Sequence, residues 1–460
     1  MLKVLLNSPC NYYTSVEILT KSLGLSYIKA YCENRNMNVS IQIVPNIDRR
    51  ILEREKPDIV GLSSYAATYG RVVDISRLCR ELGIKVVVGG EQITTLPHLL
   101  TADMDIGVLG EGEYVFEQLL RCFDNGWDAS SLMEIPGLVF YGADGKLRAS
   151  GPFIPLKSLD DLPIPDLLLG NEDTDTLCLM TSRGCPYRCV FCATGWHKNV
   201  RWFSPERVIE TIKFHTDKYP GIKRIKFWDD LFTVKTKRIE EIVVLLEANG
   251  LTEKVNYSIA TRTDHINEEL VHLLRRMNCI HVSMGMESGS EKTLAYIKKG
   301  LKVESNKKAA ELLHKHRLYS EASFIIGFPY ETMEDIFQTY SFIKSIPLSK
   351  VQVFLPVPYP GTGLWNYALQ KNLVTENGMN WEALDLIATM YKPRQVLDRF
   401  VVLSETLSRK HLYHLLKKFG RLARFKTFQY TLVLLIRNPE IIFSRLKREI
   451  KFVFMNKKRT

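Results

Sequence analysis

Apolar and polar residues alternate along the first third of the chain in the rhythm of strands followed by helices. Short, partly β-branched apolar runs that end in Gly, Ser or Pro are separated by segments of helical length. The strand-like runs are residues 3–8, 39–45, 58–65, 85–90 and 105–113, and the helical segments are 15–35, 69–82 and 113–124. This alternation predicts a doubly wound parallel sheet of the flavodoxin or Rossmann type over residues 1–130.

The carboxyl ends of these predicted strands are rich in small residues. Ligands of a doubly wound sheet bind beyond the strand ends, and small residues there let a large flat ligand approach the backbone. The residues concerned are Ser8, Pro9, Ser63, Ser64, Gly89, Gly90, Gly110 and Gly112. Glycine also ends many strands that bind nothing, so the pattern alone leaves both interpretations open.

Three further segments follow the predicted sheet. Residues 131–170 are typical of a linker, with a small hairpin at 142–145 and an extended stretch that four prolines punctuate. Strands and helices alternate again over residues 171–375, and residues 376–460 have the pattern of basic amphipathic helices. We therefore expect two α/β domains, a linker and a helical extension.

Composition places the chain among ordinary globular proteins, because 45% of its 460 residues are hydrophobic and 25% are charged. Nine cysteines are too sparse for a disulfide scaffold, and the first residues lack the features of a secretory signal. The apolar runs are far shorter than the roughly 18 residues that a membrane-spanning helix needs. We expect a protein of the reducing cytoplasm.

The net charge of +11 is unevenly distributed. Residues 392–460 carry 18 Lys and Arg against 4 acidic residues, a net of +14, and the remaining 391 residues carry 44 against 47, a net of −3. The basic character thus belongs to the tail, so the overall charge does not predict nucleic-acid binding.

The strongest motif is the segment TSRGCPYRCVFCATG, which places Cys185, Cys189 and Cys192 in a C-x3-C-x2-C arrangement. Three thiolates on one tight loop can ligate three irons of a 4Fe-4S cluster and leave the fourth iron without a protein ligand. A zinc site with His197 as the fourth ligand is the less favoured alternative, because structural zinc usually takes two paired ligand knuckles.

This loop, with Phe191 before its third cysteine, resembles the signature of radical S-adenosylmethionine (SAM) enzymes. In that family SAM chelates the open iron, and one-electron reduction cleaves it to methionine and a 5′-deoxyadenosyl radical. The resemblance extends to five further strand-like runs, at 222–230, 255–263, 281–288, 321–329 and 351–363. Together with the cysteine-bearing strand they imply a partial (β/α)6 TIM-like barrel over residues 171–375.

The resemblance also implies which residues contact SAM. Asp229 and Asp230 occupy the place of an acidic motif beside the methionine amino group, and Arg262 the place of a residue for the SAM carboxylate. Glu287 corresponds to a ribose-binding carboxylate, and the strip that begins at Gly327 lies beside adenine. Two purely structural roles stay open: an ion pair between Arg262 and Asp230, and a helix cap by Asp229.

The amino-terminal third, followed by a linker and this barrel, resembles the cobalamin-binding subgroup of radical SAM enzymes. The stretches PDIVGLSSY, VVVGGEQITTLP and GVLGEGE carry the resemblance. It implies cobalamin contacts at Ser63, Ser64, Gly89, Gly90 and Gly110.

Two departures from the subgroup pattern concern the cobalt. Residues 1–130 contain no DxHxxG motif, and His98 is their only histidine. Gln92 stands where relatives often carry histidine. A domain that is kept without cobalamin is therefore an alternative.

With both cofactors, the implied reaction is methylation of an unactivated carbon of a small-molecule or lipid-like substrate, with a one-electron donor such as flavodoxin or ferredoxin. Without cobalamin, the alternative is a radical cyclisation or rearrangement. A second cluster is not expected, because the cysteines at 32, 79 and 122 fall in predicted helices. A non-enzymatic module on a decayed barrel is disfavoured by the intact cysteine triad.

The tail leaves three roles open. Its helices, expected at 408–428 and 439–454, can cap the open side of the barrel, lie on a membrane surface, or bind nucleic acid. Capping is the favoured role, and peripheral membrane contact is the second. Nucleic-acid binding is the least expected, because no RNA-binding module is recognisable.

Overall fold

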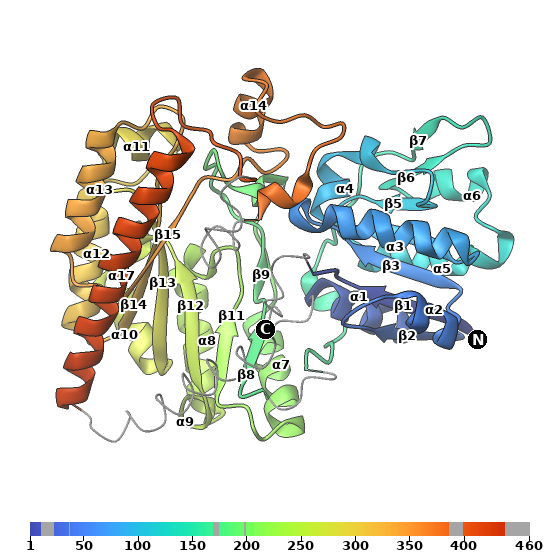
Figure 1. The fold of residues 1–460 in the computed structure, drawn as a ribbon. Coiled ribbons are helices and arrows are strands. Elements are labelled where there is room, and N and C mark those ends of the chain that lie inside the picture. Colours follow the sequence, from blue (N-terminus) through green and yellow to red (C-terminus); the bar gives the residue numbers. More distant parts are fainter. Residues whose placement is uncertain (11–22, 36, 169–173, 197–198, 386–398, 438–460) are drawn as a thin grey trace.

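The computed structural model describes residues 1–10, 23–35, 37–168, 174–196, 199–385 and 399–437. Two sheets organise the chain, one in an amino-terminal domain and one in a larger domain that the carboxyl-terminal helix accompanies (Figure 1). The α/β architecture expected from the pattern of strands and helices is confirmed.

The amino-terminal sheet has seven strands in the order β2-β1-β3-β4-β5-β6-β7. Its first five strands are parallel and run in the flavodoxin-like order, with the switch point between β1 and β3. The strands are β1 Leu2–Asn7, β2 Val39–Ile43, β3 Ile59–Ser63, β4 Lys85–Gly89, β5 Ile106–Val108, β6 Leu138–Tyr141 and β7 Leu147–Ala149. The helices are α1 Leu23–Glu33, α2 Arg49–Glu55, α3 Tyr69–Glu81, α4 Glu91–Thr95, α5 Glu113–Arg121 and α6 Ala129–Glu134.

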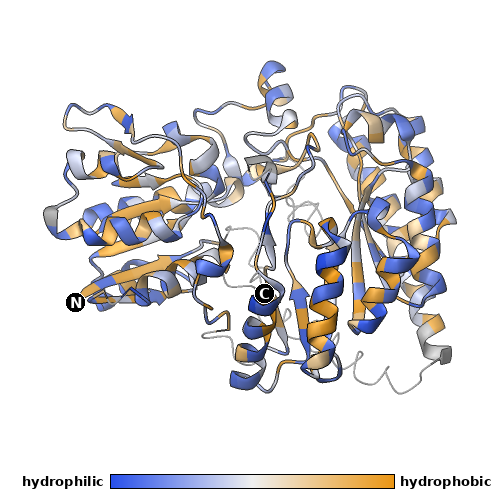
Figure 2. Ribbon diagram, turned by 180° about the vertical axis from the view of Figure 1, so that it is seen from behind, coloured by the Kyte–Doolittle hydropathy of each residue, from blue (hydrophilic) through white to orange (hydrophobic). Residues whose placement is uncertain are grey.

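Both faces of this sheet are apolar, as expected for parallel strands covered by helices on two sides. Val87 packs into the core that includes α1 and α5, whereas Val86 and Val88 pack into the core that includes α2 and α3. Figure 2 shows hydrophobic residues concentrated in these strands between the helices.

The hairpin expected within the 131–170 linker forms β6 and β7, which continue the sheet instead of standing apart from it. The buried residues of β6 pair antiparallel with β5. Without β6, β5 would be an open edge with unpaired backbone groups. The hairpin signal was local, whereas this pairing depends on long-range contacts.

The second sheet has six parallel strands in the order β15-β14-β13-β12-β11-β8, so β8 and β15 form the edges of a partial barrel. The strands are β8 Thr176–Leu179, β11 Arg224–Phe227, β12 Asn256–Thr261, β13 Cys279–Glu287, β14 Tyr319–Ile325 and β15 Lys350–Phe354. The helices are α7 Pro205–Lys218, α8 Thr236–Ala248, α9 Leu251–Lys254, α10 Glu268–Arg276, α11 Glu291–Tyr296, α12 Val303–Lys315, α13 Met333–Ser345 and α14 Gly363–Gln370. The short strands β9 Ser182–Arg183 and β10 Arg201–Trp202 pair antiparallel beside it.

Local sequence fixes where several barrel helices begin. The Ser204 hydroxyl accepts a hydrogen bond from the backbone N–H of Arg207 before α7, whose first residue is Pro205. Thr332 and Asp335 form a reciprocal capping box at the start of α13. These caps satisfy backbone donors that the first helical turn leaves free.

The carboxyl-terminal helix α17, Arg409–Arg437, lies along β15 and α13 (Figure 1). The residues that it buries in the barrel core are Leu412, Leu415, Phe419 and Leu422. The second tail helix expected at 439–454 lies outside the described residues. No helix in the described part of the chain has the length and hydropathy needed to cross a bilayer.

Candidate active site

The three cysteines lie on one loop that leaves the first barrel strand and passes through β9. Two backbone hydrogen bonds fix this loop: the N–H of Val190 donates to the carbonyl of Ile297 at 3.1 Å, and the N–H of Leu364 donates to the carbonyl of Val190 at 3.1 Å. The end of α11 and the start of α14 thus hold the loop at its centre.

The thiols of Cys185 and Cys189 each interact electrostatically with Cys192, and all three cysteines are half-buried. Among the described residues, no three His, Cys, Asp or Glu side chains are gathered tightly enough to hold a single metal ion. Thiolates that bind different irons of one cluster lie further apart than the ligands of one ion. The case for a cluster therefore rests on the ligand set, three half-buried thiols on one loop, which a 4Fe-4S cluster with one open iron requires.

Two cations face the loop. Burial raises the pKa of the Cys189 thiol, and the charges of Lys299 and Arg262 oppose that rise. Positive charge beside cysteines favours the thiolate, which is the form that binds iron. The surroundings of the loop therefore suit metal ligation.

Arg262 is buried at the end of β12, over the ring of Tyr187. Its guanidinium donates to both carboxylate oxygens of Asp264 at 3.0 Å and to the carbonyl of Lys299 at 2.8 Å. The ion pair with Asp230 considered from the sequence is thus replaced by one with Asp264. Nη1 of Arg262 is buried without a hydrogen-bond partner in the described structure, so one donor remains for a bound anion.

Glu287 ends β13 with a positive φ of 62° and pairs with Lys299, a residue that sequence reasoning missed. The two charged atoms are 2.9 Å apart, and both side chains are more than nine-tenths buried. A buried carboxylate needs such a partner to stay ionised. The ammonium group also lies 5.8 Å from the ring centroid of Phe191, which packs against Phe328.

The two neighbouring aspartates have different surroundings. Asp229 is buried and accepts hydrogen bonds from the N–H and hydroxyl of Thr181, at 2.5 and 2.7 Å, and from the N–H of Ser182 at 2.7 Å. Burial raises its pKa to about 6. Asp229 therefore braces the connection from β8 to the cysteine loop instead of capping a helix. Asp230 is exposed and accepts from the N–H of Gly184 at 3.0 Å.

Gly327 has a positive φ of 96°, and a Cβ there would lie 2.7 Å from Leu412 of α17. Its N–H donates to Glu331 at 2.5 Å, and the N–H of Phe328 donates to the same carboxylate oxygen at 3.2 Å. Burial raises the pKa of Glu331 to about 7. The sequence offered no signal for Glu331 beyond a carboxylate four residues after the glycine.

Some of the small residues predicted at the strand ends of the amino-terminal sheet lie next to one another, namely Ser64, Gly89 and Gly90. The N–H and hydroxyl of Ser64 both donate to the carbonyl of Gly89 at 2.8 Å, and a Cβ on Gly90 would lie 2.6 Å from the Ser64 carbonyl. A Cβ on Gly110 would collide with the ring of Phe153. Both glycines are thus required by packing within the chain, and a cobalamin contact at this edge, including one from Ser63, stays a prediction.

Glu91 and Gln92 also lie at this edge of the amino-terminal sheet, although the sequence did not predict either of them as a cofactor contact. Gln92 is 1% exposed, and neither polar atom of its side chain has a partner in the described structure. Such an unpaired buried amide costs about 1–3 kcal/mol. Burial raises the pKa of Glu91 to about 7, with a further contribution from Asp230 of the barrel domain. The start of α4 therefore faces the barrel and offers an unsatisfied polar group.

A buried ion-pair network joins the two domains beside the cysteine loop. Arg183 contacts Glu111 at 3.0 Å and Glu113 at 2.6 Å, and Arg201 contacts Glu111 at 2.7 Å. Although burial alone would raise the pKa of Glu111, the two arginines hold it at about 2. In the sequence the GEGE segment is visible only as part of a family resemblance, and nothing there indicates its partners, which lie 70 or more residues away.

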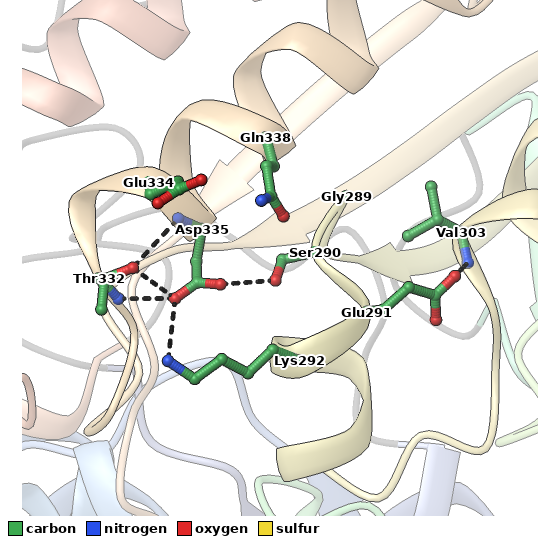
Figure 3. Close-up of a pocket in the computed structure, with 9 residues that line it drawn as sticks. All are labelled: Gly289, Ser290, Glu291, Lys292, Val303, Thr332, Glu334, Asp335 and Gln338. Atoms are coloured by element: carbon green, nitrogen blue, oxygen red, sulfur yellow. Dashed lines mark hydrogen bonds and ion pairs between the residues drawn. The ribbon is translucent and has the colours of Figure 1, made fainter.

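A surface pocket of about 560 Å³ lies at the starts of α11 and α13 (Figure 3). Asp335 accepts hydrogen bonds there from the hydroxyls of Thr332 and Ser290, at 2.6 and 2.8 Å, and pairs with Lys292 at 3.5 Å. Its carboxylate is already paired within the chain, and the cysteine loop does not line this pocket.

Comparison with known proteins agrees with this arrangement. The family model described as the radical SAM superfamily matches residues 179–343, and that of the B12 binding domain matches residues 12–120. An uncharacterized methyltransferase of Pyrococcus horikoshii is 32% identical over 391 residues, covering 80% of this chain and 83% of that protein. The anaerobic magnesium-protoporphyrin IX monomethyl ester cyclase of Rubrivivax gelatinosus is 26% identical, covering 79% of this chain and 67% of that protein.

A solved structure shares the fold. The radical SAM methyltransferase TsrM from Kitasatospora setae, with cobalamin and a 4Fe-4S cluster bound, superimposes with a TM-score of 0.69 at 18% identity, covering 82% of this chain and 77% of that one. The chain therefore belongs to the radical SAM superfamily, in the subgroup whose members carry an amino-terminal B12-binding domain.

Proposed function

We propose that this protein cleaves SAM reductively at a 4Fe-4S cluster held by Cys185, Cys189 and Cys192. In this proposal cobalamin binds at the facing edge of the amino-terminal domain, and the enzyme methylates an unactivated carbon of a small-molecule or lipid-like substrate. The observation that carries the proposal is the position of the cysteine loop, which buried ion pairs of Arg183 and Arg201 tie to the B12-type domain.

Several groups at the barrel strand ends have roles in this scheme. Nη1 of Arg262 receives the SAM carboxylate, and Glu287, which Lys299 holds at 2.9 Å, accepts hydrogen bonds from ribose hydroxyls. The backbone at Gly327, which Glu331 holds, forms the wall beside adenine. On the opposite side, the amide of Gln92 contacts cobalamin.

When bound, the cofactors supply the difficult chemistry, a 5′-deoxyadenosyl radical from SAM and a transferable methyl group from cobalamin. The chain holds them at a fixed separation and keeps water away from the reacting carbon. A one-electron donor such as flavodoxin or ferredoxin supplies the reducing electron.

The relatives favour methyl transfer and keep one alternative open. The Pyrococcus horikoshii relative is named a methyltransferase, whereas the Rubrivivax gelatinosus relative is named a cyclase. Radical cyclisation without methyl transfer is therefore the second candidate.

The test replaces the cysteines one at a time with alanine in anaerobically purified protein. We expect each of Cys185→Ala, Cys189→Ala and Cys192→Ala to abolish formation of 5′-deoxyadenosine from SAM after reduction with dithionite. Cys122→Ala is the matched control, because this half-buried cysteine lies in the other domain, and it should keep the reaction. Retained cleavage in all three loop variants would contradict the cluster assignment.

A further inference from the structure

The inner face of the barrel sheet carries a row of polar side chains below the cysteine loop. Lys226 is in register with Ser258, and Ser258 with His281 of the next strand. On the neighbouring strands Glu321 is in register with Lys350. Side chains in register on parallel strands point to the same side of the sheet, so these residues share one face.

Burial shows which face this is. Along β8, β11 and β15 buried residues alternate with partly exposed ones. The buried set, such as Ile225 and Phe227, packs against the surrounding helices, so it faces outward. The partly exposed set, which includes Lys226 and Lys350, therefore faces the lumen. Solvent therefore reaches the side chains of Lys226 and Lys350 on this face of the sheet.

The lumen at this level has more cationic than anionic groups. Glu321 accepts from His281 at 2.9 Å and pairs with Lys350 at 3.2 Å, so one carboxylate serves both groups. Lys226 has no ion pair within the described part of the chain, and its ammonium group lies 4.0 Å from the ring centroid of Trp228. Arg224, nearer the start of the same strand, is already paired with Asp175 at 3.7 Å.

The two lysines are close enough to influence each other. Burial lowers the pKa of Lys226, the charge of Lys350 lowers it further, and Glu321 and Cys178 only partly oppose the shift. An ammonium group that has lost water without gaining a carboxylate partner is unfavourable on its own. A bound anion would relieve this imbalance.

We infer that the barrel lumen binds an anionic group of the substrate, a carboxylate or a phosphate, between Lys226 and Lys350. The inference rests on the proposed function, because it places the substrate in the lumen below the SAM site. Trp228, which directly follows the end of β11 and points to the same face as Lys226, is 45% exposed and offers an apolar wall for the rest of the molecule.

The depth of this site sets the length of the substrate. Lys226 lies four residues before Asp230, and the chain continues beyond the end of β11 over this stretch, so the two residues are at most about 14 Å apart. A carbon that reacts near the strand ends therefore lies on the order of 10 Å from the bound anion. The substrate class is thus an amphiphilic acid with an apolar body and its charge at the far end.

Site-resolved lysine labelling tests this inference on the full chain with its cofactors reconstituted. Lys226 is acetylated with acetic anhydride, and peptide mass spectrometry measures its labelling in the presence of hexanoate, hexyl phosphate or neutral hexanamide. We expect hexanoate or hexyl phosphate to protect Lys226 at a concentration at least ten-fold lower than hexanamide does, and the better of the two identifies the anion. Lys223, exposed just before the same strand, is the internal control and should stay unprotected.

The same labelling experiment is repeated with variants of two lysines. Lys350→Gln should raise the protecting concentration of the preferred anion about ten-fold, and Lys223→Gln should leave it unchanged. Any one of three results would overturn the inference. Hexanamide could protect Lys226 as well as the anions do, Lys350→Gln could leave the protecting concentration unchanged, or acetic anhydride could fail to label Lys226.

Failure of this inference is separable from failure of the proposed function. Iron content and 5′-deoxyadenosine formation are measured on the same preparation, and neither depends on an anion in the lumen. Normal SAM cleavage without selective protection rejects the anion site alone. Selective protection without any SAM cleavage rejects the proposed function and leaves an anion-binding barrel.

Discussion

The Nη2 atom of Arg183 lies 2.6 Å from the Glu113 carboxylate, so a residue two positions before the first cysteine of the triad is bonded to the amino-terminal domain. Both side chains are at least nine-tenths buried. Buried ion pairs as well as apolar packing therefore hold the cysteine loop against the B12-type domain.

We predict that Arg183→Ala lowers the free energy of unfolding by about 3–5 kcal/mol, because it leaves buried carboxylates without a partner. Urea unfolding under anaerobic conditions measures the change. The exposed pair of Arg276 and Glu247, 2.6 Å apart, provides a matched control, and Arg276→Ala should cost less than about 1 kcal/mol. If both variants lose the same free energy of unfolding, the buried interdomain ion pair does not stabilise the protein more than an exposed one does.

The sequence predicted the parallel strands of both sheets because each is a short apolar run with turn residues at its end. It also predicted the cysteine triad, whose three members lie within eight residues of one another. It missed Lys299 and Glu331, and it marked Gln92 only as a departure from a family pattern, because the significance of all three depends on burial and on partners that only the fold supplies. The interdomain contacts of Glu111 were hidden for the same reason, since a GEGE segment does not reveal which arginines it will meet.

Stability should fall as pH rises from about 4.5 towards 8, in part because of Glu331. Its pKa is raised to about 7 in the folded protein, so the folded state binds a proton that the unfolded state has already released. The loss of unfolding free energy is absent below the pKa that Glu331 has in the unfolded chain, and it is complete above the pKa that Glu331 has in the folded protein. At 1.36 kcal/mol per pKa unit, this loss amounts to about 3 kcal/mol.

Glu331→Gln should flatten this part of the pH profile, because glutamine keeps a carbonyl for the N–H of Gly327 and cannot ionise. Urea midpoints between pH 5 and pH 8 measure the effect. Parallel profiles for the variant and the original chain would contradict the assignment to Glu331.

SAM affinity should depend on the buried pair of Lys299 and Glu287. We predict that Glu287→Ala and Lys299→Met each weaken SAM binding about ten-fold, a change worth roughly 1.4 kcal/mol. Anaerobic equilibrium dialysis with reconstituted protein measures the dissociation constant. Lys302→Met, an exposed lysine three residues further on, is the matched control. Unchanged affinity in both site variants would remove the pair from the SAM site.

Gln92 should have opposite effects on the empty and the loaded protein. Gln92→Leu removes an unpaired buried amide at similar volume, so the chain without cobalamin should gain about 1–2 kcal/mol of stability. The same change should lower cobalamin affinity if the amide contacts the cofactor. Chemical unfolding without cobalamin and cobalamin binding by equilibrium dialysis measure the two effects, with exposed Gln370→Leu as the control. A variant that loses stability and keeps cobalamin affinity would contradict this role.

The metal content of the purified protein is the decisive measurement for the proposed cofactors. The protein is purified without oxygen from cells supplied with cobalamin, and iron, cobalt and the absorbance spectrum are measured per chain. We expect about four irons per chain, as in one 4Fe-4S cluster, together with one cobalt. Four irons without cobalt would contradict methyl transfer and favour cyclisation or rearrangement, and a chain without iron would contradict the radical chemistry itself.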